Sequence, residues 1–414
     1  MFYAGLDLGT SGVRVCVIDQ QHDIIAEAKL HYPHADKQTC EMWWQSCCQL
    51  IRSLPKTIRT KIGFLAIDGT SGSVLLVNNA GQPVTEPLLY NDHDASFTMP
   101  DKDLSGLNDT FIRVLRLLEQ VNLKKDFMGL RIVTQADYIK GKLTGYFGIS
   151  DQNNCFKLGY DVATKQWPSW MADYGVTTTM LPKVLSSGQL VSVVLPSIAK
   201  ALSLSSDLQL VAGTTDSVAA VMATKISQVG SAVTSLGSTM VLKVLSDKPI
   251  TAPEYGVYSQ PYFNQWLVGG ASNCGGQILR QYFDDVAMQS MTKQMNIQVP
   301  TGIHYYPLTK IGERFPVNDP QLEPVLTPRP DNDVVFFQAL LESLSRVEST
   351  GYQLLKKLGA PLISEITTVG GGSENKQWMK MREAVLGIPV NRAEYTEAAY
   401  GAALLASDRG DLSK

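Results

Sequence analysis

The first thirty residues alternate short apolar runs with small or polar turns. Phe2–Leu8 is an apolar run, Val13–Ile18 alternates apolar and other residues, and Ile24–Tyr32 follows a second polar turn. Runs of this length, bounded by turn residues, are typical of strands. The pattern therefore predicts a three-stranded β-meander whose first turn is the small-residue segment 9–12.

Apolar spacing changes to the helical period from residue 40 to residue 54, and Thr39 is a suitable N-cap for such a helix. A strand is expected at 61–67, followed by a turn at 68–73. A long helical pattern covers 334–358, and a helix of small residues is expected from 397 to 406. Strands interspersed with helices indicate an α/β protein.

The opening pattern recurs after residue 224. Ser231–Ser235 and Met240–Leu245 read as strands on either side of the turn 236–239, and Ile366–Val369 reads as a strand that runs into three glycines. Two similar strand–turn–strand segments in one chain suggest two related halves.

Composition narrows the function classes. The chain has 414 residues, with 36 Lys plus Arg against 39 Asp plus Glu and a net charge of −3. This balance argues against a dedicated binder of nucleic acids or anionic membranes. No apolar run approaches the ~20 residues that span a bilayer. The six cysteines contain no Cys-x-x-Cys pair, which favours reduced thiols and a cytoplasmic protein.

Asp7-Leu-Gly-Thr-Ser-Gly12 is the first segment that could carry chemistry. Glycines let the backbone approach an anion closely, while Thr10 and Ser11 add hydroxyl donors. Asp7 could hold Mg²⁺ directly or through water, because hard cations prefer oxygen ligands. An ordinary hairpin turn remains the alternative for Gly9–Gly12.

Two later glycine segments could also approach a nucleotide. Gly237-Ser238 could hold phosphate from the second half, and Gly370–Gly372 could let a flat ligand lie close, with Asn375 hydrogen-bonding a base or ribose. A flexible loop is the alternative. The sequence contains no Gly-x-x-x-x-Gly-Lys-Ser/Thr segment, so a Walker-type NTPase is unsupported.

Asp216 ends a strand and precedes a small-residue helix. A carboxylate there could accept a proton from a hydroxyl group, although a lone Asp in this position is also a common helix cap. The five histidines show no zinc-ligand spacing, and no hydrolase-type Gly-x-Ser-x-Gly elbow is present.

Taken in order, these motifs resemble the FGGY family of carbohydrate kinases along nearly the whole chain. The matching segments are Asp7-Leu-Gly-Thr-Ser-Gly, Gly213-Thr-Thr-Asp-Ser-Val, Gly237-Ser-Thr and Gly370-Gly-Gly-Ser-Glu-Asn. Ile67-Asp-Gly-Thr-Ser-Gly-Ser, Leu88-Leu-Tyr-Asn-Asp and Ser150-Asp-Gln-Asn-Asn resemble the compact pentulose-kinase branch, which includes ribulose kinases.

The resemblance implies an α/β fold with two ribonuclease-H-like (actin/hexokinase-like) domains facing across a cleft. Residues 1–222 plus 396–414 would form the N-terminal domain, which holds the sugar site, the first phosphate turn and the catalytic carboxylate. Residues 223–395 would form the nucleotide-binding C-terminal domain, and the final helix would return to the first domain.

The resemblance also implies roles for individual residues. Asp216 would be the general base, and Asp7 would organise Mg²⁺ through water. Nucleotide and phosphate contacts would come from Gly9, Thr10, Ser11, Gly237, Ser238, Gln277, Gly371, Gly372 and Asn375. Sugar contacts would come from Thr70, Ser71, Asp92 and Asp216.

Two departures from the family pattern concern the sugar site and the catalytic strand. The family's Trp-x-Asp-x-Arg segment is Tyr90-Asn-Asp-His-Asp94 here, without the arginine, and its Gly-Gly-Asp is Thr214-Thr215-Asp216. The first departure puts the identity of the sugar in question. The second leaves the catalytic carboxylate in place.

The function expected from the resemblance is an ATP- and Mg²⁺-dependent pentulose kinase, with D-ribulose preferred and D-xylulose second. A sugar-responsive regulatory protein on the same fold is the alternative from another class, and a chaperone-like or filament-forming ATPase is less well supported. The expected partners are a sugar and ATP, without nucleic acid or membrane, in a monomer or homodimer.

Overall fold

The computed structural model describes residues 1–35, 37–99, 102–104, 107–122 and 129–408. Its internal contacts divide the chain into two compact units. The first is Met1–Ala223 together with the segment that begins at Glu397, and the second is Thr224–Thr396. The functional assignment of the two predicted domains stays a prediction. Each unit is described here by itself.

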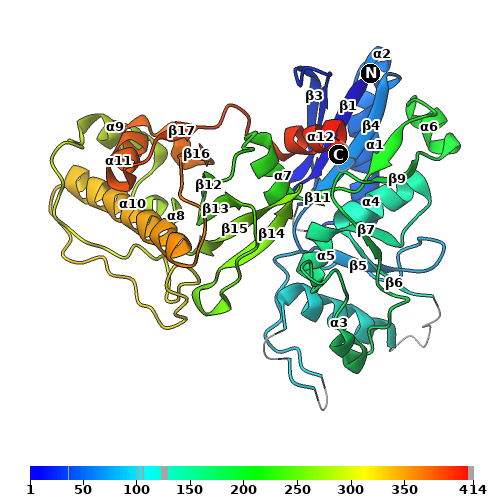
Figure 1. Cartoon of the computed structure of the whole chain (residues 1–414), viewed down its shortest axis with the longest axis horizontal. Helices are drawn as coiled ribbons and strands as arrows, with labels where there is room; N and C mark the ends of the chain where they lie inside the picture. Colours follow the sequence, from blue (N-terminus) through cyan, green and yellow to red (C-terminus); the bar gives the residue numbers. More distant parts are fainter. Residues whose placement is uncertain (36, 100–101, 105–106, 123–128, 409–414) are drawn as a thin grey trace. The chain divides into compact units, whose positions relative to one another are not determined.

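The first unit is built on a seven-stranded mixed sheet (Figure 1). Its strand order is β3-β2-β1-β4-β10-β9, and β11 also pairs with β4. The strands are β1 (Phe2–Leu8), β2 (Gly12–Ile18), β3 (Ile24–His31), β4 (Ile62–Gly69), β9 (Leu190–Val193), β10 (Gln209–Val211) and β11 (Thr214–Thr215). The first three strands are antiparallel, whereas β4 runs parallel to β1, β10 and β11.

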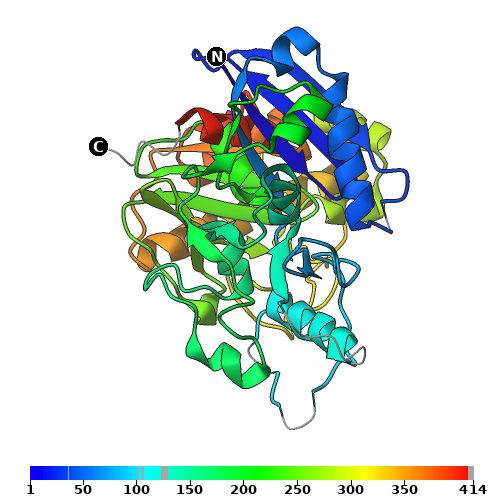
Figure 2. The same ribbon diagram turned by 90° about the vertical axis from the view of Figure 1, so that its right-hand side faces the viewer.

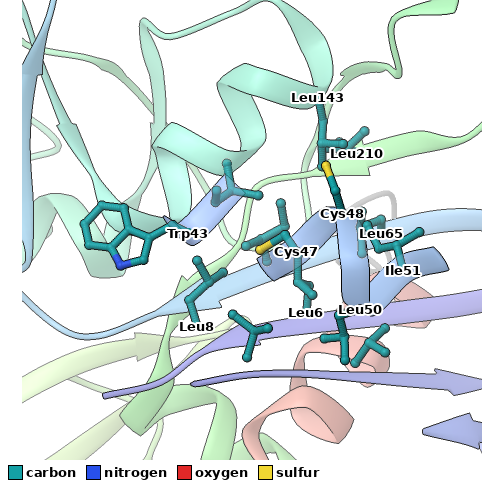
Figure 3. Close-up of a cluster of buried hydrophobic side chains, with 14 of the residues drawn as sticks. Leu6, Leu8, Trp43, Cys47, Cys48, Leu50, Ile51, Leu65, Leu143 and Leu210 are labelled. Carbon is teal, nitrogen blue, oxygen red and sulfur yellow. The ribbon is translucent and has the colours of Figure 1, made fainter. Parts of the chain in front are cut away.

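Helices cover both faces of this sheet. Alternation along β1 sends Leu6 towards α1 (Cys40–Ser53), where it joins a buried cluster with Trp43 and Cys47 (Figure 3). On the other face a Cβ on Gly5 would lie 2.0 Å from the carbonyl oxygen of Ala399 in α12 (Ala398–Asp408), so glycine permits this close approach. The C-terminal helix therefore packs directly on the first strand of the chain.

Figure 2 shows α1 along the blue strands of the first unit. The remaining helices of this unit are α2 (Lys56–Arg59), α3 (Asp109–Asn122), α4 (Gln135–Thr144), α5 (Gln152–Leu158), α6 (Pro196–Leu202) and α7 (Asp216–Ala223). Two small sheets pair β5 (Val74–Val77) with β6 (Arg131–Thr134) and β7 (Ile149–Asp151) with β8 (Lys183–Leu185). The cysteines of the whole chain are free and buried, as expected for reduced thiols.

The second unit repeats the plan of the first. Its six-stranded sheet has the order β14-β15-β13-β12-β16-β17, with three antiparallel pairings followed by two parallel ones. The strands are β12 (Ser231–Leu236), β13 (Met240–Ser246), β14 (Tyr258–Tyr262), β15 (Gln265–Ser272), β16 (Glu365–Val369) and β17 (Val390–Arg392). The helices are α8 (Gln277–Tyr282), α9 (Asp285–Gln294), α10 (Asp333–Lys357) and α11 (Lys376–Leu386). The predicted relation between the halves is confirmed at the level of sheet topology.

One boundary differs from the prediction in a way that matters for the site. The fourth strand was expected to end at Ile67, but β4 continues to Gly69, so Asp68 lies in the strand. The ladder continues because Asp68 pairs with Asp7 of β1 on one side and with Thr214 of β11 on the other. No helix within the described residues combines the length and the apolar character that crossing a bilayer requires.

Candidate active site

Three carboxylates gather at the carboxyl ends of neighbouring parallel strands in the first unit. Asp7 is the penultimate residue of β1, Asp68 lies opposite it on β4, and Asp216 directly follows β11. Asp7 is 3% exposed and Asp68 is 0% exposed. Parallel register therefore brings together carboxylates that are more than 200 residues apart in the sequence.

Burial raises the pKa of each of these acids. Burial is the largest cause at all three, and the charge of Asp7 adds to it at Asp68 and Asp216. The pKa of Asp216 rises to about 6, and that of Asp68 rises well above its ordinary value. A carboxyl with a pKa near neutrality is suited to proton transfer at physiological pH.

Arg14 supplies positive charge beside this group. Its Nη1 donates to Asp7 Oδ2 at 3.0 Å, and its Nε lies 3.0 Å from Glu397 at the start of the C-terminal segment. The turn between β1 and β2 stands beside this pair, closed by a hydrogen bond from the Gly9 N–H to the Gly12 carbonyl. Arg14 thus ties the first turn to the C-terminal segment.

The exposed side chains of the turn are Thr10 and Ser11. Thr10 Oγ1 donates to the hydroxyl of Tyr90 at 3.3 Å, and Gln38 Nε2 donates to the Thr10 carbonyl at 2.8 Å. The predicted phosphate turn therefore contacts the segment 90–94 that was predicted to line the sugar site.

Asp216 is fixed from two directions. Its Oδ1 accepts hydrogen bonds from Ser71 Oγ at 3.0 Å and from the N–H of the adjacent Ser217 at 2.7 Å. An N-cap instead accepts from the N–H two or three residues further on. The contacts of Asp216 therefore resemble those of a positioned carboxylate more than those of a cap.

The two other predicted sugar contacts are engaged within the protein. Thr70 Oγ1 lies 2.6 Å from Ser73 Oγ and donates to Gln135 Oε1 at 2.7 Å, and Thr70 is 3% exposed. Asp92 Oδ2 accepts from the Leu89 N–H at 2.6 Å, which closes the loop that carries it. The structure brings Ser71 to Asp216, while Thr70 holds the strand end in place.

Sequence reasoning missed Arg113 of α3, a buried guanidinium that holds this loop. It donates to three backbone carbonyls, those of Asp92 at 3.0 Å, Gly72 at 3.2 Å and Tyr90. Burial lowers the pKa of Arg113, which is 3% exposed. No motif marks such a residue, because its partners are main-chain atoms of distant segments.

A second group, in the segment 150–154 that the sequence matched without a role, supports the strand before Asp216. Asn154 of α5 donates to the Thr214 carbonyl at 3.1 Å, and Asn153 donates to Thr214 Oγ1 at 3.0 Å. Asp151 caps this helix by accepting from both of their N–H groups at 2.9 Å. The segment that begins at Ser150 therefore positions the strand that precedes Asp216.

In the second unit, three glycine-containing segments converge beside the end of β12. The Gly276 N–H donates to the Gly237 carbonyl at 2.8 Å, and the Gln277 N–H donates to the Ser238 carbonyl at 3.2 Å. A Cβ on Gly275 would lie 2.4 Å from the Ser238 carbonyl oxygen, so only glycine fits there. Gly237, Ser238 and Gln277 are all exposed.

The triple-glycine segment completes this cluster. Gly370 has a φ of 86°, and a Cβ there would lie 2.7 Å from the Leu236 carbonyl oxygen. Gly371 faces open space, and Gly372 packs against Leu236. Asn375 caps α11 through its Oδ1 and donates to Thr292 Oγ1 at 3.0 Å. Its predicted contact with adenosine stays a prediction.

Comparison with known proteins identifies the family. Models of the FGGY family of carbohydrate kinases match both halves of the chain, the N-terminal domain at residues 2–113 and 110–223 and the C-terminal domain at 232–407. The xylulose kinase of Escherichia coli strain K12 is 23% identical over 427 residues, covering 93% of this chain and 85% of that protein. The xylulose kinase of Staphylococcus xylosus is 20% identical over 444 residues, covering 98% of this chain and 90% of that protein.

A solved structure described as a xyloylose kinase from Brucella ovis has a TM-score of 0.86 at 22% identity, covering 99% of this chain and 91% of that one. This likeness confirms the expected two-domain, actin/hexokinase-like fold. Because the two domain models together account for most of the sequence, this chain belongs to the FGGY family of carbohydrate kinases and is an ATP-dependent sugar kinase.

Proposed function

We propose that this sugar kinase phosphorylates a hydroxyl group of a pentulose, with Asp216 as the general base. The observation that carries the proposal is the setting of Asp216, which Ser71 holds by a 3.0 Å hydrogen bond at the end of β11. Its pKa, raised to about 6 by burial and by Asp7, lets it exist as a carboxylate at neutral pH and still accept a proton readily.

In this mechanism the oxygen of the sugar hydroxyl attacks the γ-phosphorus and its proton moves to an Asp216 carboxylate oxygen. The bond between the γ-phosphorus and the β,γ-bridging oxygen breaks, and ADP leaves. Ser71 keeps the carboxylate aimed while the proton moves. The exposed Thr10 and Ser11 of the first turn, and Gly237 and Ser238 of the second unit, are proposed to bind the phosphates. In each unit, these exposed residues lie directly after the first strand.

Mg²⁺ is proposed as the cation of the reaction. The donor set supports this, because Asp7 is a buried carboxylate next to a second one and hard cations prefer such oxygens. When bound, Mg²⁺ would neutralise charge on the transferring phosphoryl group. Asp7 would hold it, and Arg14 would keep the Asp7 carboxylate oriented.

D-ribulose is proposed as the preferred sugar, from the resemblance of the 67–73, 88–92 and 150–154 segments to the pentulose-kinase branch. D-xylulose is the second candidate, because the curated relatives described above are named xylulose kinases. At their identities of 20% and 23%, those names do not decide between two epimeric pentuloses.

A coupled ADP-release assay across pentuloses, hexuloses, polyols and glycerol tests this proposal. We expect the highest kcat/KM for D-ribulose, with D-xylulose next. A higher value for D-xylulose would reverse the order and keep the mechanism. Sugar-dependent thermal stabilisation without ADP release would favour the regulatory alternative and overturn the proposed catalysis.

A further inference from the structure

Glu313 is a buried carboxylate of the second unit that the proposed mechanism does not use. It is 2% exposed and lies in the long segment between α9 and α10. Its Oε1 accepts from the N–H groups of Asn273 at 2.6 Å and Arg314 at 2.8 Å. Its Oε2 accepts from Ser272 Oγ at 2.7 Å and from the Tyr306 hydroxyl at 3.1 Å. Donors to both oxygens offset the cost of burying this charged group.

Two of these donors belong to the loop that follows β15. Ser272 is the last residue of that strand, and Asn273 is the next residue. Ser272 Oγ also accepts from the Cys274 N–H at 3.0 Å, and Asn273 Nδ2 donates to the Gly312 carbonyl at 2.9 Å. Asn273 Oδ1 in turn accepts from Arg314 Nε at 2.7 Å. Hydrogen bonds from both sides therefore tie the loop after β15 to the segment that carries the buried carboxylate.

The loop after β15 continues directly into the residues that contact the proposed phosphate turn of the second unit. The Gly276 N–H donates to the Gly237 carbonyl at 2.8 Å. A Cβ on Gly275 would lie 2.4 Å from the Ser238 carbonyl oxygen and 2.5 Å from the Thr239 Cα, so the two backbones are in contact. Because they touch, a shift of the loop after β15 would also displace the turn.

We infer that Glu313 is a positioning residue for nucleotide binding, which holds the loop after β15 against the turn of Gly237 and Ser238. This inference rests on the proposed phosphate contacts of those two residues. Both oxygens of Glu313 are engaged by protein donors, so it acts through the loop and not on the nucleotide. Backbone groups bind an anion best when they are already held in the bound geometry. Loss of Glu313 should therefore weaken nucleotide binding.

A role in general stability is the alternative, and Glu342 of α10 offers a matched control for it. Glu342 is 5% exposed and accepts from the Thr301 N–H at 3.1 Å and from Thr301 Oγ1 at 2.6 Å. It is thus a second buried carboxylate that fixes a loop of the same unit through a backbone N–H and a hydroxyl. These contacts join Thr301 to α10, away from the proposed phosphate turn.

ADP binding by the sugar-free protein, measured by isothermal titration calorimetry, tests the inference. Glu313→Met removes both acceptors at similar size. Glu313→Gln keeps an acceptor for the N–H groups, and its amide can donate to the two hydroxyls. Ser272→Ala is a milder change that decides the question if Glu313→Met does not fold. Glu342→Met is the control, and circular dichroism would show that each variant is folded at the temperature of the titration.

We expect Glu313→Met to bind ADP about 10-fold or more weakly and to raise the KM for ATP similarly, with the sugar KM changed less than about 3-fold. Ser272→Ala should weaken ADP binding by about 3-fold or more, whereas Glu313→Gln and Glu342→Met should stay within about 3-fold of the wild-type protein. Unchanged ADP affinity in Glu313→Met, or in Ser272→Ala if Glu313→Met does not fold, would overturn the inference. An equal loss in Glu342→Met would also overturn it, because general stability would then explain the effect.

Ser238→Ala, measured in parallel, separates failure of the inference from failure of the proposed phosphate contact. Weaker ADP binding in Ser238→Ala with unchanged binding in Glu313→Met would refute the role of Glu313 alone. Unchanged binding in both variants would refute that role and the phosphate contact of Ser238 together. Neither titration involves the sugar or Asp216, so the proposed pentulose and general base are judged by their own assays.

Discussion

The Asp216→Asn variant distinguishes the two possible roles of Asp216, general base and helix cap, because only the first requires a carboxylate. Asn keeps the size of the side chain and an Oδ1 that can still accept from Ser71 Oγ and from the Ser217 N–H. It cannot accept the proton of the sugar hydroxyl. If Asp216 is the base, turnover should fall by about 10²–10⁴-fold while sugar and ATP binding stay nearly normal.

The folding stability of the same variant should increase, although its turnover falls. The pKa of Asp216 rises from 3.8 to about 6 on folding, and each pKa unit corresponds to about 1.36 kcal/mol. The shift therefore sets an upper limit of about 3 kcal/mol on the amount by which ionised Asp216 destabilises the folded protein. Partial exposure of the side chain and its place at the start of α7 reduce the expected effect to about 1–2 kcal/mol.

The sign follows from proton linkage. Since the folded-state pKa lies above the unfolded one, Asp216 contributes most to stability below pH 4, and this contribution is lost as the pH rises to about 6. Asp216→Asn should therefore be more stable than the wild-type protein at pH 7.5, and the difference should shrink towards pH 4.5.

Urea denaturation at both pH values, together with steady-state kinetics at pH 7.5, would measure these effects. A variant with near-normal kcat would refute the assignment of Asp216 as base. A variant that is less stable than the wild-type protein at pH 7.5 would refute the reasoning from burial, and would instead favour a structural role for the charge at the helix start.

Three further outcomes are expected. The kcat/KM for the sugar should decline below about pH 6 with a slope of one, since Asp216 must be ionised to accept a proton, and a flat profile down to pH 5 would contradict this. Arg113→Met should raise the sugar KM more than it lowers kcat, because three loop carbonyls lose their buried donor, and an unchanged KM would exclude a link between this loop and the sugar. In the second unit, Arg382→Met should lower the free energy of unfolding by about 3–5 kcal/mol, because Glu348 loses both 2.6 Å hydrogen bonds, and a double variant with Glu348→Leu should recover part of the loss in urea denaturation.

The fold was readable from the sequence because its signals are local and repeated. The β-meander at residues 2–32 and its counterpart after residue 231 follow from apolar runs and turns, and both have the predicted topology. Strand ends were less accurate. The extension of β4 to Gly69 depends on the pairing of Asp68 with residues at positions 7 and 214, and no local pattern encodes those partners.

The site was predictable where chemistry and sequence spacing coincide. Asp7 and Asp216 stand next to small-residue turns that mark them, and the structure brings both to the same end of one sheet. Asp68 also precedes a small-residue turn, but no local pattern indicates its pairing with Asp7, and Arg113 carries no mark at all. One depends on strand register and the other on main-chain carbonyls from two loops, so their contacts become visible only when the chain is folded.

The loop at 90–94 shows why a missing motif residue need not mean a missing interaction. The arginine that the family pattern leads one to expect is absent there, yet Arg113 of α3 sends a guanidinium to the carbonyls of Tyr90 and Asp92. Its three hydrogen bonds to described residues go to backbone oxygens, so this cation fixes the shape of the loop. A hydroxyl of the sugar would then be recognised by oxygen atoms such as those of Ser71 and Asp92, which distinguish epimers through position and not through charge. Discrimination between D-ribulose and D-xylulose should accordingly depend on the geometry of this loop. Arg113→Lys retains the charge but loses the forked set of donors, so it should bring the kcat/KM values for the two sugars closer together.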